Sequence, residues 1–152
     1  MWRFGLKNLY ILLIELFVFC ACENIDVSEE GVPLAVQDFV SQYFPGGGIS
    51  RLVIDKDEYY ITIEDGPDIV IRVKNPNSTE YTVVLLSFTG NGYTMPENMA
   101  YNLIPEELYN YISGIESLNQ IYDYEFTNAM YKVTLQNTIV TYDSSTNTIE
   151  EN

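Results

Sequence analysis

Apolar residues recur at helical spacing in two separate stretches of the chain. The first stretch begins at Pro33 and ends at Pro45-Gly46-Gly47-Gly48, and the second begins at Pro105. Their apolar positions are three and four residues apart and comprise Val36, Phe39, Val40, Tyr43 and Phe44, then Leu108, Tyr111, Ile112 and Ile115. Proline suits the first turn of a helix, where its missing N–H costs nothing. The pattern predicts two amphipathic helices, each with one apolar face.

After each predicted helix, apolar and polar residues alternate with the period of two that is typical of half-buried strands. The alternating runs cover residues 52–54, 59–63 and 69–73 after the first helix, and 122–126, 131–135 and 138–142 after the second. A short stub follows Asn147. The segment Tyr81–Phe88 is apolar on both faces, which predicts a strand at the centre of a sheet.

The helix and its strands form a unit that occurs twice. Pro33 returns as Pro105, an offset of 72 residues. After Asp65 the second copy is aligned with two residues fewer, so that Ile69-Val70 falls on Ile139-Val140. A repeat of this length indicates two modules rather than a solenoid. The predicted fold is α+β: two tandem helix-plus-antiparallel-strand units share one sheet of about seven to eight strands, with the helices on one face.

The first 22 residues have the features of a secretion signal. Arg3 and Lys7 precede an apolar run that is too short for a comfortable membrane span. The run ends at Ala21-Cys22, which resembles the lipobox of bacterial lipoproteins, and this resemblance implies cleavage before Cys22 and acylation of its sulfur. An uncleaved N-terminal anchor helix is the alternative.

These features divide the chain into five segments. They are a lipoprotein signal peptide (1–21), an acidic tether (22–31), a first unit (32–90), a connector (91–103) and a second, shortened unit (104–152). The tether would hold the folded units away from the lipid, because its composition is too acidic and too poor in apolar residues to fold alone.

The charge balance narrows the classes of partner. The chain carries 22 Asp and Glu against 7 Lys and Arg, a formal net charge of −15. Neither a nucleic acid nor an anionic headgroup would find a basic patch, so we expect no nucleic-acid partner and membrane contact through the lipid anchor only. The same charge favours attraction to a basic protein surface or to cations.

The sequence contains no residue pattern that is typical of a catalytic site. The chain has no histidine, which excludes a His-based triad or zinc site, and both of its cysteines, Cys20 and Cys22, lie in the signal region. The run Asp55-Lys56-Asp57-Glu58 resembles the start of a calcium loop, but it lacks the mid-loop glycine and is predicted to be a hairpin turn. We therefore expect no catalytic residue, no metal and no cofactor, and predict that the protein is not an enzyme.

A set of polar and aromatic residues falls on the strand face opposite the predicted core. Its candidate interface members are Tyr60, Thr62, Arg72, Lys132, Thr134 and Tyr142. Two other strand tyrosines, Tyr59 and Tyr131, fall on the core side together with the helix residues Tyr43 and Tyr111. Tyr and Arg are enriched at protein interfaces, which favours a binding surface; a solvated sheet face is the alternative.

Two motifs carry a family resemblance. Pro-x5-Phe-x3-Tyr-Phe-Pro-Gly runs from Pro33 to Gly46, and Tyr-x-Ile-x-Ile-x-Asp-Gly runs from Tyr59 to Gly66. Both resemble the PepSY-like, beta-lactamase-inhibitor-like domains of bacterial envelope lipoproteins. The second copy lacks the Tyr-Phe-Pro-Gly end and the glycine after Asn137. The resemblance implies a fold similar to the beta-lactamase inhibitory protein, a tandem repeat whose sheet faces a protein target.

The expected function is that of a lipid-anchored binding module in the bacterial cell envelope, on the periplasmic side or the cell surface. It would engage an envelope or secreted protein through its open sheet face, with inhibition of a hydrolase as one outcome. The alternative is an accessory lipoprotein that binds a peptide, glycan or cation in a cleft between the units. An open sheet without a deep pocket favours the first, and polar groups converging on an apolar pocket favour the second.

Overall fold

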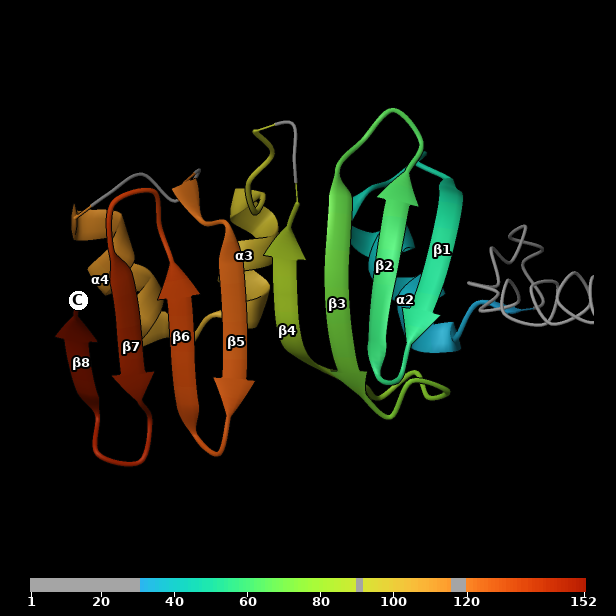
Figure 1. The fold of residues 1–152 in the computed structure, drawn as a ribbon. Helices are drawn as coiled ribbons and strands as arrows, with labels where there is room; N and C mark the ends of the chain where they lie inside the picture. Colours follow the sequence, from blue (N-terminus) through green and yellow to red (C-terminus); the bar gives the residue numbers. More distant parts are fainter. Residues whose placement is uncertain (1–30, 90–91, 116–119) are drawn as a thin grey trace, which may run out of the picture.

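Eight antiparallel strands follow one another in chain order across a single sheet (Figure 1). The computed structural model describes residues 31–89, 92–115 and 120–152. The strands in these ranges are β1 (Ile49–Asp55), β2 (Glu58–Ile63), β3 (Asp68–Lys74), β4 (Thr82–Phe88), β5 (Asp123–Thr127), β6 (Met130–Thr134), β7 (Ile139–Asp143) and β8 (Thr148–Glu151). The α+β class and a sheet of the predicted size are confirmed.

Three helices accompany the sheet within the described ranges. They are α2 (Leu34–Tyr43), α3 (Glu97–Leu103) and α4 (Glu106–Ile115). In the view of Figure 1 all three are drawn behind the strands, with α2 behind the β1 half and α4 behind the β8 half. No helix in the described part of the chain is long and apolar enough to span a membrane.

The apolar stripe of α2 packs into the core as its spacing predicts. Phe39 is fully buried, and the centroid of its ring lies 5.0 Å from that of Tyr43. On α4 the fully buried positions are Leu108 and Ile112. The expectation that Tyr111 is buried like Phe39 is wrong. Its ring is half-buried and its hydroxyl donates to Glu151 Oε2 at 2.9 Å, because α4 reaches the edge strand β8, where the core ends.

Helix α3 was not predicted from the sequence, which assigned residues 91–103 to a connector. Pro96 immediately precedes the helix, Glu97 stands in its first turn, and Met99 and Ala100 are buried. The proline before the first turn and the glutamate within it are signals of a helix start. The helix has only seven residues and two fully buried positions, too few to produce a clear apolar period.

Strand β4 lies between β3 and β5, near the middle of the sheet, as its doubly apolar pattern predicts. Val83, Val84, Leu86 and Phe88 are all buried. In the part of the chain that the structure describes, no polar or charged residue is buried to the same degree. The core is therefore apolar and continuous from α2 through β4 to α4.

The end of α2 is set by backbone geometry. Gly46 has a φ of +87°, a conformation that side chains disfavour. At Gly47 an added Cβ would lie 2.8 Å from Cγ2 of the buried Ile63, so that a side chain there would displace the core. The glycine run thus fits the chain closely against β2, and it is more than a flexible stop.

The register of the second hairpin differs from the sequence alignment. Ile61 pairs with Ile69 in the first hairpin, and Val133 pairs with Val140 in the second. Ile61 and Val133 are 72 residues apart, whereas their partners Ile69 and Val140 are 71 residues apart. The cause is turn length. Three residues separate Ile63 from Pro67, whose carbonyl accepts from the Ile63 N–H, whereas two separate Leu135 from Thr138 in the equivalent bond.

The β6–β7 connection is therefore one residue shorter than the β2–β3 connection, where the alignment predicted a difference of two residues. A shift of one residue moves every side chain of a strand to the other face. Val140 is 0% exposed and Tyr142, on the same face of β7, is 4% exposed, so the prediction that Tyr142 faces outward is wrong. The Tyr142 hydroxyl instead donates to Asn147 Oδ1 at 3.0 Å, within the β7–β8 hairpin.

The predictions for the N-terminus concern residues outside the ranges that the structure describes. This holds for the signal peptide (1–21), for Cys22 and for all of the acidic tether (22–31) except Gly31.

Candidate functional site

The strand face opposite the core carries the predicted candidate residues of the first unit. Tyr60 lies opposite Val70, and Thr62 lies opposite Asp68, on the neighbouring strands β2 and β3. Tyr60 is 40% exposed. Because side chains alternate along a strand, these residues point away from the buried row formed by Tyr59, Ile61 and Ile71. We call this surface the outer face.

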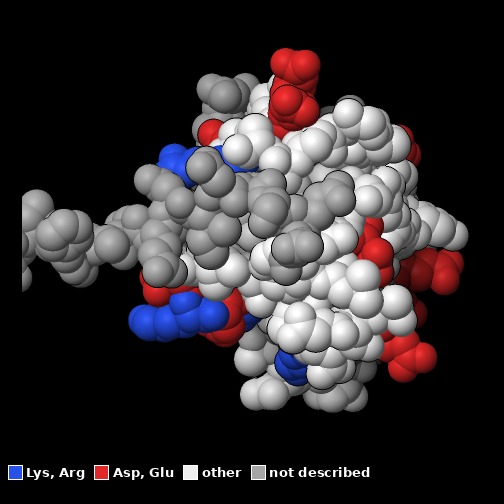
Figure 2. Space-filling view, turned by 90° about the vertical axis from the view of Figure 1, so that its right-hand side faces the viewer, with Lys and Arg blue, Asp and Glu red and all other residues white. Residues whose placement is uncertain are grey.

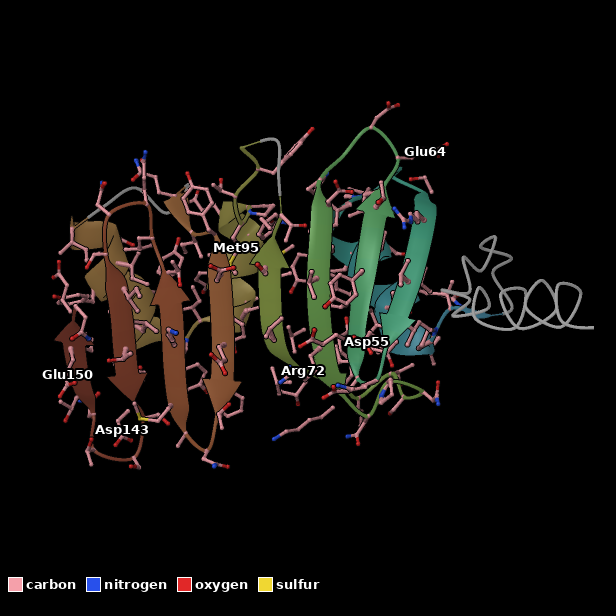
Figure 3. The ribbon with its side chains drawn as sticks, viewed as in Figure 1. Asp55, Glu64, Arg72, Met95, Asp143 and Glu150 are labelled. Atoms are coloured by element: carbon pink, nitrogen blue, oxygen red, sulfur yellow. The ribbon has the colours of Figure 1, made fainter. Side chains whose placement is uncertain are left out.

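A charged network is centred on Arg72 at one end of the outer face. Arg72 lies opposite Glu58 in the β2–β3 ladder, and its Nη2 donates to Glu58 Oε1. The other oxygen of the same carboxylate, Oε2, accepts from the Tyr60 hydroxyl at 2.9 Å. The Nε of Arg72 lies 3.1 Å from Asp57 Oδ2 in the β1–β2 turn. Figure 3 shows Arg72 and the adjoining Asp55 at the same lower end of the sheet.

The network perturbs the protonation of its members. The hydrogen bond from Arg72, followed by that from Tyr60, lowers the pKa of Glu58. The same carboxylate raises the pKa of Tyr60, since an ionised phenol would face a negative charge. Glu58 is therefore held as a carboxylate and Tyr60 as a neutral phenol, and each holds the other in a defined position.

The Nε atom of Arg72 is buried and lacks a well-aligned hydrogen bond, although Asp57 lies within ion-pair distance. The whole side chain of Arg72 is 35% exposed. Asp57 and Glu58 both lie against this cation, so the turn that resembles a calcium loop is engaged in ion pairs.

A shallow groove adjoins Arg72 where β4 and β5 separate. The two strands pair only from Leu85 to Ser87, and the β3–β4 register shifts beside Arg72. The groove has a volume of about 320 Å³ and is lined by Asp57, Arg72, Val73, Lys74, Val84, Phe126, Thr127 and Asn128. Lys74 Nζ lies 5.8 Å from the centroid of the Phe126 ring. We call it the outer groove.

The predicted residues of the second unit do not join this cluster. Lys132 and Thr134 are on β6, four strands from β2, which places them ~19 Å from Tyr60 at the usual strand spacing. Lys132 is exposed and lies opposite Glu125 and Thr141. Tyr142 lies in the core. Of the six candidates, the structure brings together Tyr60, Thr62 and Arg72.

Both signs of charge are present near the β1 edge. Seen from this edge, basic side chains lie among acidic ones, and further acidic side chains stand at the top and right of the molecule (Figure 2). Within the described ranges, no group of three or more His, Cys, Asp or Glu is arranged to hold a metal ion.

A second concave site lies where the two halves of the sheet meet; the sequence offered a cleft between the units as an alternative but did not identify its residues. It has a volume of about 400 Å³ and lies among the ends of α2 and α3 and strands β4 to β6. Its lining is aromatic and uncharged and consists of Gln42, Tyr43, Tyr81, Thr82, Val83, Asn102, Leu103, Tyr124, Phe126 and Tyr131. We call it the inner cleft. Tyr43 and Tyr131 had been assigned to the core from their periodicity, which does not distinguish a packed ring from one that lines a cavity.

Three tyrosines of the inner cleft, Tyr43, Tyr81 and Tyr124, have a raised hydroxyl pKa. Burial raises the pKa of Tyr43, against a smaller opposing effect of its hydrogen bond with Asn102. Burial also raises the pKa of Tyr81 and of Tyr124. These hydroxyls therefore remain protonated well above neutral pH.

Comparison with known proteins gives similarity at the level of structure. No family model and no curated protein matches this chain. Two solved structures from Bacteroides vulgatus ATCC 8482 each give a TM-score of 0.58, with 16% and 14% identity over 82% and 87% of this chain. The match covers 94% and 98% of those proteins. One is provisionally described as a periplasmic protein of unknown function and the other as a periplasmic protein from the DUF2874 family.

A protein from Bacteroides thetaiotaomicron is similar to the same extent. It gives a TM-score of 0.59 and 16% identity over 83% of this chain and 94% of its own length, and is provisionally described as a calcium-regulated periplasmic protein. At such identities the likeness establishes a shared fold and nothing about activity.

Proposed function

We propose that this protein is an extracytoplasmic binding module that engages a protein partner through the outer face around Tyr60 and Arg72, and that it catalyses no reaction. The observation that carries the proposal is the network in which Arg72 holds Glu58 and Glu58 holds the exposed Tyr60. Side chains fixed before binding lose less conformational entropy when a partner arrives. Tyr and Arg are also the residue types that most often dominate binding energy.

We also infer that the sheet is built from two related units whose helices leave the outer face open. Helix α2 precedes β1 to β4, and α4 precedes β5 to β8. The pairing of Ile61 with Ile69 has a counterpart in that of Val133 with Val140. This internal similarity supports the resemblance to PepSY-like domains, which in turn suggests a protein target and, as one consequence, inhibition of a hydrolase.

Charge indicates the kind of partner. The chain has a formal net charge of −15; Asp57 is ion-paired with Arg72, and the charge of Asp55 acts on Tyr60. A partner surface with basic groups around an acceptor for the Arg72 guanidinium fits this arrangement, and its association should weaken as salt rises. The descriptions of the structural neighbours as periplasmic support an extracytoplasmic location.

The test is site-specific photo-crosslinking in the native host. A photoreactive phenylalanine analogue would replace Tyr60 in one strain and Tyr101 in another. Tyr101 is a matched control, because it is a tyrosine on α3 and is 71% exposed. We expect a discrete protein adduct from position 60 and none of that mass from position 101.

The same strains also test whether crosslinking at position 60 depends on the Arg72 network or only on the exposure of that position. Arg72→Gln, introduced beside the photoreactive position 60, should reduce the adduct at least tenfold if Arg72 contributes directly to binding. The absence of a discrete adduct at position 60, or an equal yield in the Arg72→Gln strain, would contradict the proposal.

The lipid anchor is proposed on the N-terminal sequence alone. Labelled palmitate should enter the wild-type protein and the Cys20→Ser variant, and it should be absent from Cys22→Ser. Incorporation that survives the loss of Cys22 would refute the assignment without affecting the proposal for the outer face.

A further inference from the structure

We propose that the inner cleft is a binding site for a neutral oligosaccharide, independent of protein binding at the outer face. The cleft is the larger of the two concave sites described above, and its volume of about 400 Å³ lies in the ~300–1,000 Å³ range of small-molecule sites. It combines aromatic rings with uncharged hydrogen-bonding groups.

The lining of the cleft is neutral although the chain is strongly charged. The sequence has 29 charged side chains, 22 acidic and 7 basic, yet all ten described residues that line the cleft are uncharged. A charged ligand would lose its hydration there and would find no charged group in the lining; Lys74, whose Nζ lies 5.8 Å from the centroid of the Phe126 ring, is not among the lining residues. An anionic ligand would also be repelled by the net charge of the molecule.

One wall of the cleft is aromatic and is held by two neighbouring strands. Phe126 of β5 stacks on Tyr131 of β6, with centroids 4.5 Å apart and planes inclined by 26°. Tyr124, two residues before Phe126, lies 6.4 Å from Tyr131. Such rings give a rigid apolar surface, and the C–H groups of a pyranose ring can pack on it with little loss of side-chain entropy.

The opposite wall supplies polar groups from the helices. Tyr43 at the end of α2 and Asn102 near the end of α3 share a side-chain hydrogen bond, and Tyr81 adjoins them. Protonated phenols both donate and accept, and a carboxamide offers two donors and an acceptor. A purely apolar ligand would leave these groups unpaired, whereas the hydroxyls of a sugar satisfy them.

The neutral, hydroxyl-rich ligand that satisfies both walls is an oligosaccharide. A peptide segment would also present apolar and polar groups, but at least one terminus or charged side chain would commonly lie near a site of this size. Gln42, Thr82 and Asn102 in the lining are exposed to solvent, so the remainder of a longer glycan chain can leave the cleft past them.

The test uses saturation-transfer NMR on the full-length protein purified from the cells that express it. The probes are maltohexaose, cellohexaose and xylohexaose as neutral chains, with hexagalacturonate as an acidic chain of the same length. We expect saturation of the ring C–H protons of at least one neutral chain, and at least tenfold weaker binding of the acidic one.

Variants locate the binding. Tyr81→Ala and Asn102→Ala each remove a group from the cleft, and Asn102 is itself exposed although it bonds to the buried Tyr43. Tyr101→Ala on α3 and Asn110→Ala on α4 are matched controls outside the lining. We expect at least a tenfold loss of affinity in the two cleft variants and none in the controls, with Asn102→Ala still unfolding cooperatively in thermal denaturation.

Three results would overturn the proposal. They are the failure of all three neutral chains to bind at millimolar concentration, equal binding of hexagalacturonate, and full binding by both cleft variants. None of these results bears on crosslinking at position 60, so the two proposals fail separately.

Discussion

Phe39 contributes more to the packing of α2 than its neighbours, because its ring is 0% exposed and contacts both Tyr43 and Phe44. Phe39→Ala would leave a cavity that the surrounding β-strands cannot fill. We expect a loss of about 3–5 kcal/mol in the free energy of unfolding, measured by denaturant titration. Tyr111→Ala at the equivalent position of α4 is the control and should cost clearly less, since that ring is half-buried. A loss below about 1 kcal/mol for Phe39→Ala would contradict full burial.

Glu58 should respond to pH through its contact with Arg72. Because the pKa of Glu58 is lowered in the folded protein, the unfolded chain binds this proton more readily. The contact therefore adds stability above the unfolded-state pKa, and this stability is lost as the pH falls through the lowered folded-state pKa. Arg72→Gln should raise the pKa of Glu58 towards its ordinary value, as followed by the NMR shift of the carboxyl carbon.

Lys132→Gln provides the control for that titration, because Lys132 is a cation on the same sheet, four strands away from Glu58. It should leave the pKa of Glu58 unchanged. An unchanged pKa in Arg72→Gln would show that the lowered value has another cause.

The turn between β5 and β6 is strained at one residue. Asn128 and Ala129 have φ values of 49° and 70°, and they connect the paired residues Thr127 and Met130. Two positive φ values define the mirror-image turn that favours Asn-Gly in hairpins. Ala129→Gly should therefore raise the free energy of unfolding by about 0.5–1 kcal/mol, after allowing for the greater freedom of glycine in the unfolded chain.

Ala100→Gly gives the opposite sign and serves as the control. Ala100 is buried within α3, where glycine lowers helix stability by roughly 0.5–1 kcal/mol and also removes a packed methyl group. Denaturant titration of both variants compares the effect of glycine in the β5–β6 turn with its effect in helix α3. Destabilisation by Ala129→Gly would mean that the turn is not strained.

Element prediction from the sequence succeeded where the period was long and failed where it was short. The strands of both units and helices α2 and α4 lie within a few residues of their predicted places, because several turns or alternations support each one. Helix α3 was missed because it spans less than two full turns of apolar repeat. The β6–β7 register was misassigned because one residue in a turn, which no periodicity records, decides which face Tyr142 occupies.

The two halves of the sheet should depend on each other for stability. β4 is buried along most of its length and pairs with β3 on one side and β5 on the other. A fragment of residues 31–89 would expose the β5-facing edge of this apolar strand, which is a template for association. We expect the fragment to be unstable or oligomeric in size-exclusion chromatography and chemical unfolding. A monomer that unfolds cooperatively would show that the first half folds independently.

At the scale of the whole molecule the two candidate sites differ in kind. The outer face presents a charged network on an open surface, and the inner cleft presents neutral aromatic residues between helices and sheet. The outer cluster was predicted in part, because alternation along β2 and β3 places Tyr60, Thr62 and Arg72 on one face. A cleft between the units was the alternative expectation from the sequence, but the residues of the inner cleft were not predicted, because they come from five elements that meet only in the folded chain.

The sequence by itself determined the α+β class, the central place of β4, and the burial of α2 through Phe39. It could do so because these features depend on residues close in the chain, whose periodicity records which side faces the core. Tertiary structure alone decided the inward orientation of Tyr142, the joining of Glu58 to Arg72 and Tyr60, and the assembly of the cleft between Asn102 and Tyr131. These features depend on turn length and on the approach of distant segments. The alternation of apolar and polar residues within a strand is the same whichever of its faces the preceding turn directs toward the core. Periodicity therefore does not reveal the register that the turn imposes.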